Sequence, residues 1–281
     1  MKISAICTDI DGTLLNSNRE LSPRTIAAVK ALHNKIPFIL ASSRMPSAMR
    51  HLQAELGILD QPMICFNGGY VLLYEAGSQA EPKVLDTVEI PAGICQTIFD
   101  LSQGTDIHVS LYVNDEWHAP QQDQWTEREI RNTKVNPTIS KIEDILTSWK
   151  TAESGAHKVM CMGSEEAIAQ MAEALEKQFP REIYVYRSKT TYLEIAPRAI
   201  SKATALEMLL KDRFGIPMAE VMAFGDNYND IDLLQAVGLG IAVGNAKEEV
   251  KAVAKEVTLP SVEDGVAVAI EKYCLAQQEQ V

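Results

Sequence analysis

Short apolar runs alternate with stretches of helical periodicity in the first third of the chain. Apolar residues dominate positions 2–8, 38–41 and 63–66, and helices are predicted between them. The first helix begins at Ser22-Pro23, where a serine can cap the helix and a proline fits its first turn. A strand–helix–strand–helix–strand order is typical of a parallel α/β sheet. The sequence therefore predicts an α/β fold.

The pattern changes after the third apolar run and returns late in the chain. In between, strands joined by polar turns are mixed with helices, and Asn114-Asp115 separates two short runs as a hairpin turn does. We expect an inserted α+β domain at residues 83–187. The parallel-sheet domain is then discontinuous and is built from residues 1–82 and 188–281.

Acidic residues exceed basic ones, with 38 Asp and Glu against 26 Lys and Arg and a formal net charge of −12. Nucleic-acid binding needs clustered basic residues, so no nucleic-acid partner is expected. The five cysteines are far apart and form no C-x-x-C pair, as is common in reducing compartments. The N-terminus lacks a signal-peptide pattern, and no apolar run approaches the roughly 20 residues of a membrane helix. We therefore expect a soluble cytoplasmic protein with no membrane partner.

Polar residues follow the predicted strands of the sheet. Asp9-Ile10-Asp11-Gly12-Thr13 follows the first strand, and Gly225-Asp226-Asn227-Tyr228-Asn229-Asp230 follows a later one. Ser42-Ser43-Arg44 follows the second strand, and Lys202 begins a predicted helix. Ligands bind at the carboxyl ends of parallel strands, so these acids would converge if their strands are neighbours. On their own, the two later acids could also be a turn residue and a helix N-terminal acid.

The chemistry of such a cluster follows from its charge. Two uncompensated carboxylates about 4 Å apart repel by roughly 4 kcal/mol at an effective dielectric constant of about 20. A hard divalent cation removes this conflict, and an all-oxygen site suits Mg²⁺. Lys202 and Ser42 could bind the remaining oxygens of a phosphate. The set fits covalent catalysis through an aspartyl-phosphate. Asp9 would attack phosphorus, and Asp11 would protonate the leaving alcohol and then deprotonate the hydrolytic water.

These motifs resemble those of the haloacid dehalogenase (HAD) superfamily, and in particular its Cof-type sugar-phosphatase branch. The matching segments occur in family order: D-I-D-G-T (9–13), S-S-R (42–44), F-N-G-G (66–69), S-K-A-T-A-L (201–206), G-D-N-Y-N-D (225–230) and V-G-N-A (243–246). The resemblance implies a Rossmann-like parallel-sheet core. It also implies that the insert is a cap domain, which closes over the site and selects the substrate.

The resemblance implies a role for each matching residue. Asp9 is similar to the family nucleophile, and Asp11 is similar to its acid/base. The implied Mg²⁺ ligands are Asp9, the backbone carbonyl of Asp11 and Asp226. Asp230 would orient metal-bound waters or Lys202. The implied phosphate-binding residues are Ser42, Ser43, Arg44, Lys202 and Asn229. Ser43 departs from the family pattern, because many relatives have glycine at this position.

The sequence therefore predicts an Mg²⁺-dependent phosphatase that hydrolyses small phosphorylated metabolites, such as sugar phosphates, as a monomer or weak homo-oligomer. Two alternatives stay open. A phosphotransferase or phosphomutase would pass the phosphoryl group from the same aspartate to another hydroxyl. A signalling receiver also phosphorylates an aspartate on an α/β sheet, although receivers lack a large insert. A P-loop nucleotide enzyme is disfavoured, because no G-x-x-x-x-G-K-[ST] segment occurs.

Overall fold

The computed structural model describes residues 2–32, 35–74 and 81–276. Within these ranges the chain forms two compact units. The first unit comprises residues 1–43, 49–86 and 201–281, and the second comprises residues 44–48 and 87–200. The second unit starts later than the expected insert because the strand at Lys83–Thr87 joins the sheet of the first unit. It ends later because the strand at Tyr192–Pro197 pairs within the sheet of the second.

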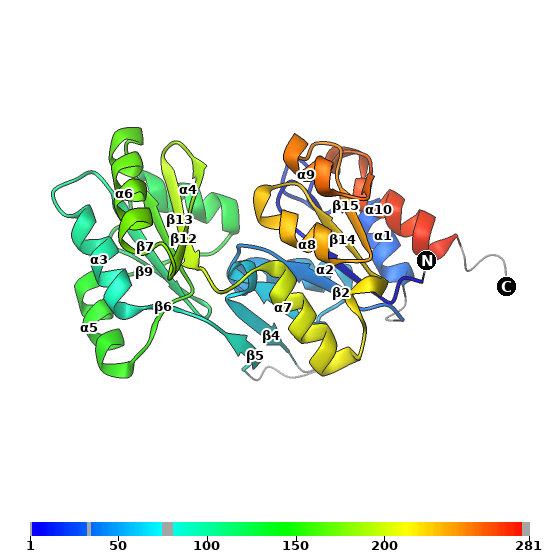
Figure 1. The fold of residues 1–281 in the computed structure, drawn as a ribbon, viewed down its shortest axis with the longest axis horizontal. Coiled ribbons are helices and arrows are strands. Elements are labelled where there is room, and N and C mark those ends of the chain that lie inside the picture. The colour runs from blue at the N-terminus through cyan, green and yellow to red at the C-terminus, as the bar shows by residue number, and fades with distance from the viewer. Residues whose placement is uncertain (1, 33–34, 75–80, 277–281) are drawn as a thin grey trace. The chain divides into compact units, whose positions relative to one another are not determined.

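An eight-stranded sheet forms the centre of the first unit, in the order β16-β15-β14-β1-β2-β3-β4-β5 (Figure 1). The strands from β16 to β3 run parallel, and β4 is antiparallel to β3. The predicted α/β class with a parallel-rich core sheet is confirmed. The strands are β1 (Ala5–Thr8), β2 (Phe38–Ala41), β3 (Met63–Cys65), β4 (Tyr70–Leu73), β5 (Lys83–Thr87), β14 (Val221–Gly225), β15 (Leu239–Ala242) and β16 (Glu256–Val257).

Helices connect and cover these strands. The helices are α1 (Pro23–Ala31), α2 (Ser47–Leu56), α7 (Lys202–Leu209), α8 (Ile231–Ala236), α9 (Glu248–Val253) and α10 (Gly265–Ile270). Short helical turns complete the unit: η1 (Phe66–Gly68), η2 (Leu210–Phe214), η3 (Met218–Glu220), η4 (Tyr228–Asp230), η5 (Ser261–Glu263) and η6 (Glu271–Leu275). The serine cap of the first helix is confirmed, because Ser22 Oγ accepts a hydrogen bond from Thr25 N at 3.0 Å.

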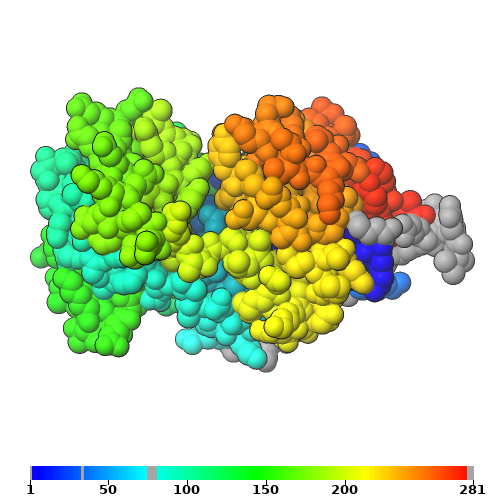
Figure 2. Space-filling view, in the orientation of Figure 1, coloured from blue at the N-terminus to red at the C-terminus, as the bar shows by residue number. Residues whose placement is uncertain are grey.

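Both ends of the chain contribute to the first unit. Helices α1 and α10, blue and red, pack side by side (Figure 1). In the space-filling view, residues after about 200 make up most of the surface of this unit that faces the reader (Figure 2). Strand β1 lies in the interior of the sheet, and its residues Ala5, Ile6 and Cys7 are fully buried.

The second unit is built on a six-stranded sheet in the order β12-β13-β11-β7-β8-β9, with a separate β6–β10 pair. Alternate residues of β7, β11 and β13 point into an apolar core that includes Val109, Leu111, Val159 and Leu193. The elements are β6 (Ile90–Pro91), α3 (Ala92–Ser102), β7 (His108–Val113), β8 (Glu116–Ala119), α4 (Gln124–Thr133), β9 (Thr138–Ile139), α5 (Ile142–Ala152), β10 (Gly155–Ala156), β11 (Lys158–Met162), α6 (Glu165–Gln178), β12 (Ile183–Lys189) and β13 (Tyr192–Pro197).

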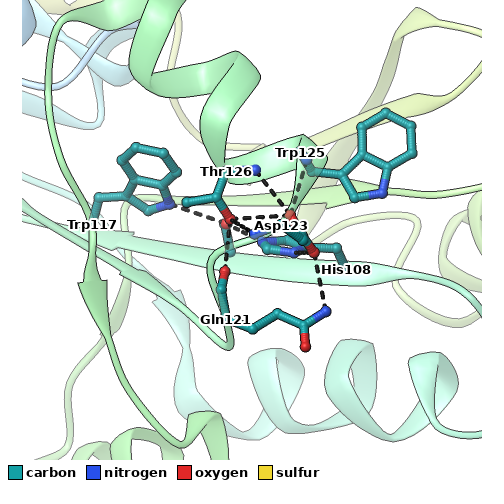
Figure 3. A network of polar contacts seen from close by, with 7 residues as sticks. His108, Trp117, Gln121, Asp123, Trp125 and Thr126 are labelled. Carbon is teal, nitrogen blue, oxygen red and sulfur yellow. Dashed lines mark hydrogen bonds and ion pairs between the residues drawn. The ribbon is translucent and has the colours of Figure 1, made fainter.

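A polar network joins the start of α4 to β7 and β8 (Figure 3). Trp117 Nε1 donates to Ser110 Oγ at 3.0 Å, and that hydroxyl lies 3.0 Å from His108 Nε2. His108 Nδ1 lies 2.8 Å from Asp123 Oδ2, and Asp123 caps α4. The order serine–histidine–aspartate is that of a hydrolase triad, but Ser110 is fully buried and cannot meet a substrate. The network therefore fastens α4 to the sheet.

Among the described residues, no helix combines the length and the apolar content needed to cross a membrane.

Candidate active site

The strand order brings three sequence motifs to one edge of the first sheet. Strand β1 lies between β14 and β2, and all three run parallel, with Thr8 opposite both Phe224 and Leu40. Asp9 N extends the pairing by donating to Phe224 O at 3.0 Å. Because parallel strands end at the same edge, Asp9, Ser42 and Asp226 leave the sheet as neighbours.

The turn after β1 is folded against Asp226. Gly12 has a φ of +83°, which favours glycine, and a Cβ atom added there would lie 2.5 Å from Asp226 Oδ2. Thr13 Oγ1 donates to Asp226 Oδ1 at 2.8 Å. Asn245 Nδ2 donates to Gly12 O at 2.7 Å. The glycine and threonine of the first motif therefore fix where the Asp226 carboxylate lies.

The loop after β14 is organised by Asp230, which is completely buried. Its Oδ2 accepts hydrogen bonds from Asp226 N at 3.0 Å and from Asn227 N at 3.1 Å. Gly225 leaves room for this arrangement, because a Cβ atom there would collide with the side chain of Asp230. One carboxylate oxygen thus shapes the loop, and the other, Oδ1, stays available to Lys202.

Lys202 is the first residue of α7 and is 1% exposed. Ser201 and Thr204 form a capping box that begins the helix. The Lys202 ammonium donates to Asp9 Oδ1 and, at 2.7 Å, to Asp230 Oδ1. The contact with Asp230 is one of the two roles that the family resemblance implies for that acid, whereas the contact with Asp9 was not predicted.

Three carboxylates gather around this lysine. Asp9, Asp226 and Asp230 each offer an oxygen, and these oxygens lie within 4.8 Å of one another. Burial raises the pKa of Asp9 well above its ordinary value; Lys202 opposes that shift, while Asp230 and Asp226 reinforce it. Burial also raises the pKa of Asp226 to about 6, against the hydrogen bond from Thr13. Burial alone would lower the pKa of Lys202, but Asp230 and Asp9 outweigh it and the pKa rises.

The charges of this cluster fit a bound cation. When all three acids are ionised, three carboxylates face one ammonium, and two negative charges are left uncompensated in a largely buried site. Oxygen is the ligand atom that Mg²⁺ prefers. The site that these residues form therefore suits a divalent cation held by carboxylates of Asp9 and Asp226.

Asp11 lies differently from its neighbours. Its Oδ1 accepts a hydrogen bond from Arg19 Nη2 at 2.7 Å, and its side chain is 38% exposed. The acid cluster found among the described residues does not include its carboxylate. Sequence reasoning missed Arg19, whose φ of +62° turns the chain back towards Asp11. No sequence pattern marks that conformation.

The three residues of the serine–serine–arginine segment differ in their burial and contacts. Ser42 is 2% exposed; its N donates to Ile64 O at 2.9 Å, and its O accepts from Asn67 N at 2.8 Å. Ser43 is half-buried. Arg44 is buried, and its Nη1 donates to Ala48 O at 2.9 Å. The guanidinium of Arg44 therefore stabilises the local backbone between Arg44 and Ala48.

Asn229 contacts a residue that the sequence-based site omitted. Its Nδ2 donates to Asn67 Oδ1 at 3.0 Å. Asn67 belongs to the F-N-G-G segment, which resembles a family segment but implies no role for this residue. The segment itself was the available signal.

Comparison with known proteins assigns the family. Residues 6–270 match the family model of haloacid dehalogenase-like hydrolases. A Haemophilus influenzae protein named "Putative phosphatase" is 33% identical over 275 residues, which cover 97% of this chain and 98% of that protein. The 5-amino-6-(5-phospho-D-ribitylamino)uracil phosphatase of Bacillus subtilis is 26% identical over 274 residues, covering 95% and 96% of the two chains.

A solved structure agrees with these matches. A haloacid dehalogenase-like hydrolase from Bacteroides thetaiotaomicron superposes with a TM-score of 0.85 at 28% identity, covering 96% of this chain and 99% of that one. The predicted family, fold and enzyme class are confirmed. The chain belongs to the haloacid dehalogenase-like hydrolases, and it is a phosphatase of that superfamily.

Proposed function

We propose that this phosphatase hydrolyses small phosphate monoesters, such as sugar phosphates, with Mg²⁺ as cofactor and through a phosphoryl group carried on Asp9. The observation that carries the proposal is the buried contact of Asp9 with Lys202 inside a cluster of three acids. Lys202 favours the carboxylate form of Asp9 against its burial, and only the carboxylate is a nucleophile.

In the first step, a carboxylate oxygen of Asp9 attacks phosphorus and the bond from phosphorus to the substrate oxygen breaks. Asp11 gives its proton to the leaving oxygen, which departs as an alcohol. In the second step, Asp11 takes a proton from water, the water oxygen attacks phosphorus, and the Asp9 carboxylate leaves. The exposed position of Asp11 beside Arg19 suits a group that meets both alcohol and water. Mg²⁺, when bound by Asp9, the backbone carbonyl of Asp11 and Asp226, screens the repulsion between the nucleophile and the phosphate.

The remaining predicted residues serve phosphate binding in this proposal. As the ester enters, Lys202 can redirect the hydrogen bond that it donates to Asp9 towards a phosphate oxygen. Asp230 holds that ammonium through Oδ1 and organises the loop after β14 through Oδ2. Ser42, Ser43, Arg44 and Asn229 complete the proposed set of phosphate contacts.

We assign the cap role to the second unit, which corresponds to the insert expected at residues 83–187. A cap that excludes water and contacts the leaving group would select the substrate. The Bacillus subtilis relative is named for a substrate with a phosphorylated ribityl chain. That name supports a small phosphorylated polyol or sugar as the substrate class of this chain.

The proposed compartment is the cytoplasm. The five cysteines are all buried, and none of them forms a disulfide within the described residues. Free thiols suit a reducing compartment. A monomeric or weakly self-associating state stays a prediction, which light scattering at several concentrations would test.

The test is phosphate release from a panel of phosphorylated sugars, polyols and nucleotides, with and without Mg²⁺. We expect turnover of small sugar or polyol phosphates that requires Mg²⁺. Asp9→Asn should abolish it, while Asp212→Asn, at an exposed position after α7, should not. Dominant transfer of the phosphoryl group to added sugar acceptors would favour the phosphotransferase alternative. A stable phosphorylated protein without turnover would favour the signalling alternative.

A further inference from the structure

The turn between β3 and β4 has an unusual backbone. Three consecutive residues have positive φ angles: Phe66 at 50°, Asn67 at 58° and Gly68 at 110°. Asparagine and glycine tolerate this region, but an aromatic side chain does not favour it, and Phe66 is also buried. Strained backbone of this kind persists only where the surrounding structure holds it, and it concentrates at functional sites.

This turn contacts the segments that carry the proposed phosphate contacts. Asn67 N donates to Ser42 O at 2.8 Å, which ties the turn to the end of β2. A Cβ atom on Gly68 would lie 2.6 Å from Ser201 O, so the turn also packs directly on the start of α7 and therefore beside Lys202. Asn67 Oδ1 accepts from Asn229 Nδ2 at 3.0 Å, which ties it to the loop after β14.

The contact with Asn229 has a chemical consequence. A side-chain amide can present either its oxygen or its nitrogen in a given direction. The acceptor on Asn67 holds Nδ2 of Asn229 towards the turn, and this fixes the rotation of the whole amide. Asn229 immediately precedes Asp230, so the amide lies beside the residue that organises the loop after β14.

We propose that Asn67 is a positioning residue for the phosphatase reaction, which acts by fixing the orientation of the Asn229 amide for phosphate binding. The inference rests on the proposed function, because it takes Asn229 as a phosphate contact. It adds a residue that touches no substrate and that works through one identified hydrogen bond.

The competing explanation is that asparagine occupies position 67 only because it tolerates a positive φ. Asn67→Gly separates the two explanations, since glycine fits the backbone and removes the side-chain acceptor. Asp264→Gly is the matched control, because Asp264 also has a positive φ, 62°, in the first unit. The set is completed by Asn229→Ala and by the double variant.

The experiment measures kcat and KM for p-nitrophenyl phosphate, the inhibition constant of inorganic phosphate, and the midpoint of thermal unfolding. We expect Asn67→Gly to raise KM and the phosphate inhibition constant together, each by about tenfold, as the loss of one oriented hydrogen bond predicts. The value of kcat should fall less, and the unfolding midpoint should stay with that of Asp264→Gly. In the Asn229→Ala background, Asn67→Gly should have no further effect on either constant.

Three results would overturn the proposal: unchanged constants in Asn67→Gly, effects of the two single variants that multiply in the double variant, or failure of Asn67→Gly to fold. The last would show that the side chain is needed for the fold itself. Absence of phosphatase activity in the unaltered protein would instead contradict the proposed function, and it would be seen before any variant is compared.

Discussion

A Cβ atom at Gly12 would lie 2.5 Å from Oδ2 of Asp226, so the turn after β1 and the loop after β14 meet where no side chain fits. The two residues come from opposite ends of the sequence, and the contact exists because β1 and β14 are parallel neighbours. The glycine of the first motif is therefore needed for its small size as well as for its positive φ.

Gly12→Ala should displace the Asp226 carboxylate. Misplacement of a catalytic group by about 1 Å can cost on the order of a hundredfold in rate, and we expect a loss of that size in kcat/KM. Gly215→Ala is the matched control, because Gly215 also has a positive φ, +64°, but has open space around its Cβ position. Gly215→Ala should lower stability and leave kcat/KM unchanged. Equal activity losses in both variants would mean that backbone strain, and not the contact with Asp226, explains the effect.

Asp226→Asn should weaken metal binding. The substitution removes one negative charge from the acid cluster, so the Mg²⁺ concentration for half-maximal activity should rise by at least about tenfold. Chelation with EDTA should abolish activity in the unaltered protein, and Mg²⁺ should restore it. The measurement is a Mg²⁺ titration of phosphate release, with Asp212→Asn as the control. A variant with the same Mg²⁺ requirement as the unaltered protein would exclude Asp226 as a ligand.

Lys202→Met should destabilise the first unit more at high pH than at low pH. The variant leaves Asp9 and Asp230 buried without their ammonium partner, which typically costs about 3–5 kcal/mol. Without Lys202, which opposes the effect of burial, the folded-state pKa of Asp9 should rise further. A raised carboxyl pKa penalises folding at high pH, and this penalty shrinks as the pH falls and the group protonates.

The measurement for Lys202→Met is thermal unfolding by circular dichroism at pH 8 and pH 5. Lys211→Met, at an exposed position in η2, is the control and should match the unaltered protein at both values. A stability difference between Lys202→Met and the unaltered protein that grows as the pH falls would contradict the account of this cluster.

His157 should make the second unit sensitive to mild acid. Burial lowers the pKa of His157 from 6.5 to about 4. Its Nδ1 accepts from Asn114 N at 2.9 Å, so the neutral ring carries its proton on Nε2, 2.9 Å from Thr87 Oγ1. Between about pH 6.5 and 4 the unfolded chain binds a proton that the folded chain excludes. Stability is therefore full above pH 6.5 and falls by about 2 kcal/mol by pH 5.

All three tryptophans, Trp117, Trp125 and Trp149, lie in the second unit, so their fluorescence during urea unfolding reports on it. His157→Gln should remove this part of the difference between pH 7 and pH 5, and His51→Gln, at an exposed position, should retain it. An unchanged pH dependence in His157→Gln would assign the acid sensitivity to other groups.

Sequence patterns predicted the helix starts and the hairpin turn. Ser22 caps α1 and Lys202 begins α7, as expected. The predicted hairpin at Asn114-Asp115 is confirmed, and Asn114 has the positive φ of 51° that its turn requires. These features are local, so a few neighbouring residues determine them.

Other elements were not predicted, because their sequence signals are weak or depend on distant residues. Helix α4 has only Trp125 and Ile130 as large apolar residues, so it shows no apolar stripe, and the Asp123 cap and its network hold it instead. The positive φ of Asp264 separates η5 from α10, and no sequence pattern marks that conformation. Strands β5 and β6 are close in sequence but join different sheets, which the local sequence does not indicate.

The candidate site shows the same division. The motifs predicted that Asp9, Asp11, Asp226 and Asp230 would converge, because they follow neighbouring parallel strands. The cluster found among the described residues contains Asp9, Asp226 and Asp230 but not the carboxylate of Asp11. The contacts of Asp11 with Arg19 and of Asn67 with Asn229 depend instead on positive φ angles at Arg19 and Asn67. Such angles do not follow from residue type alone.

The most direct test of the proposed mechanism is to identify the residue that carries the phosphoryl group. The protein would be mixed with excess p-nitrophenyl phosphate and Mg²⁺, quenched in acid before steady state, digested, and analysed by mass spectrometry. This substrate has a good leaving group, so its first step does not depend on a proton from Asp11. The account predicts a transient phosphoryl group on Asp9 that disappears as substrate is consumed. A phosphoryl group on any other residue, or phosphate release by Asp9→Asn at the rate of the unaltered protein, would contradict it.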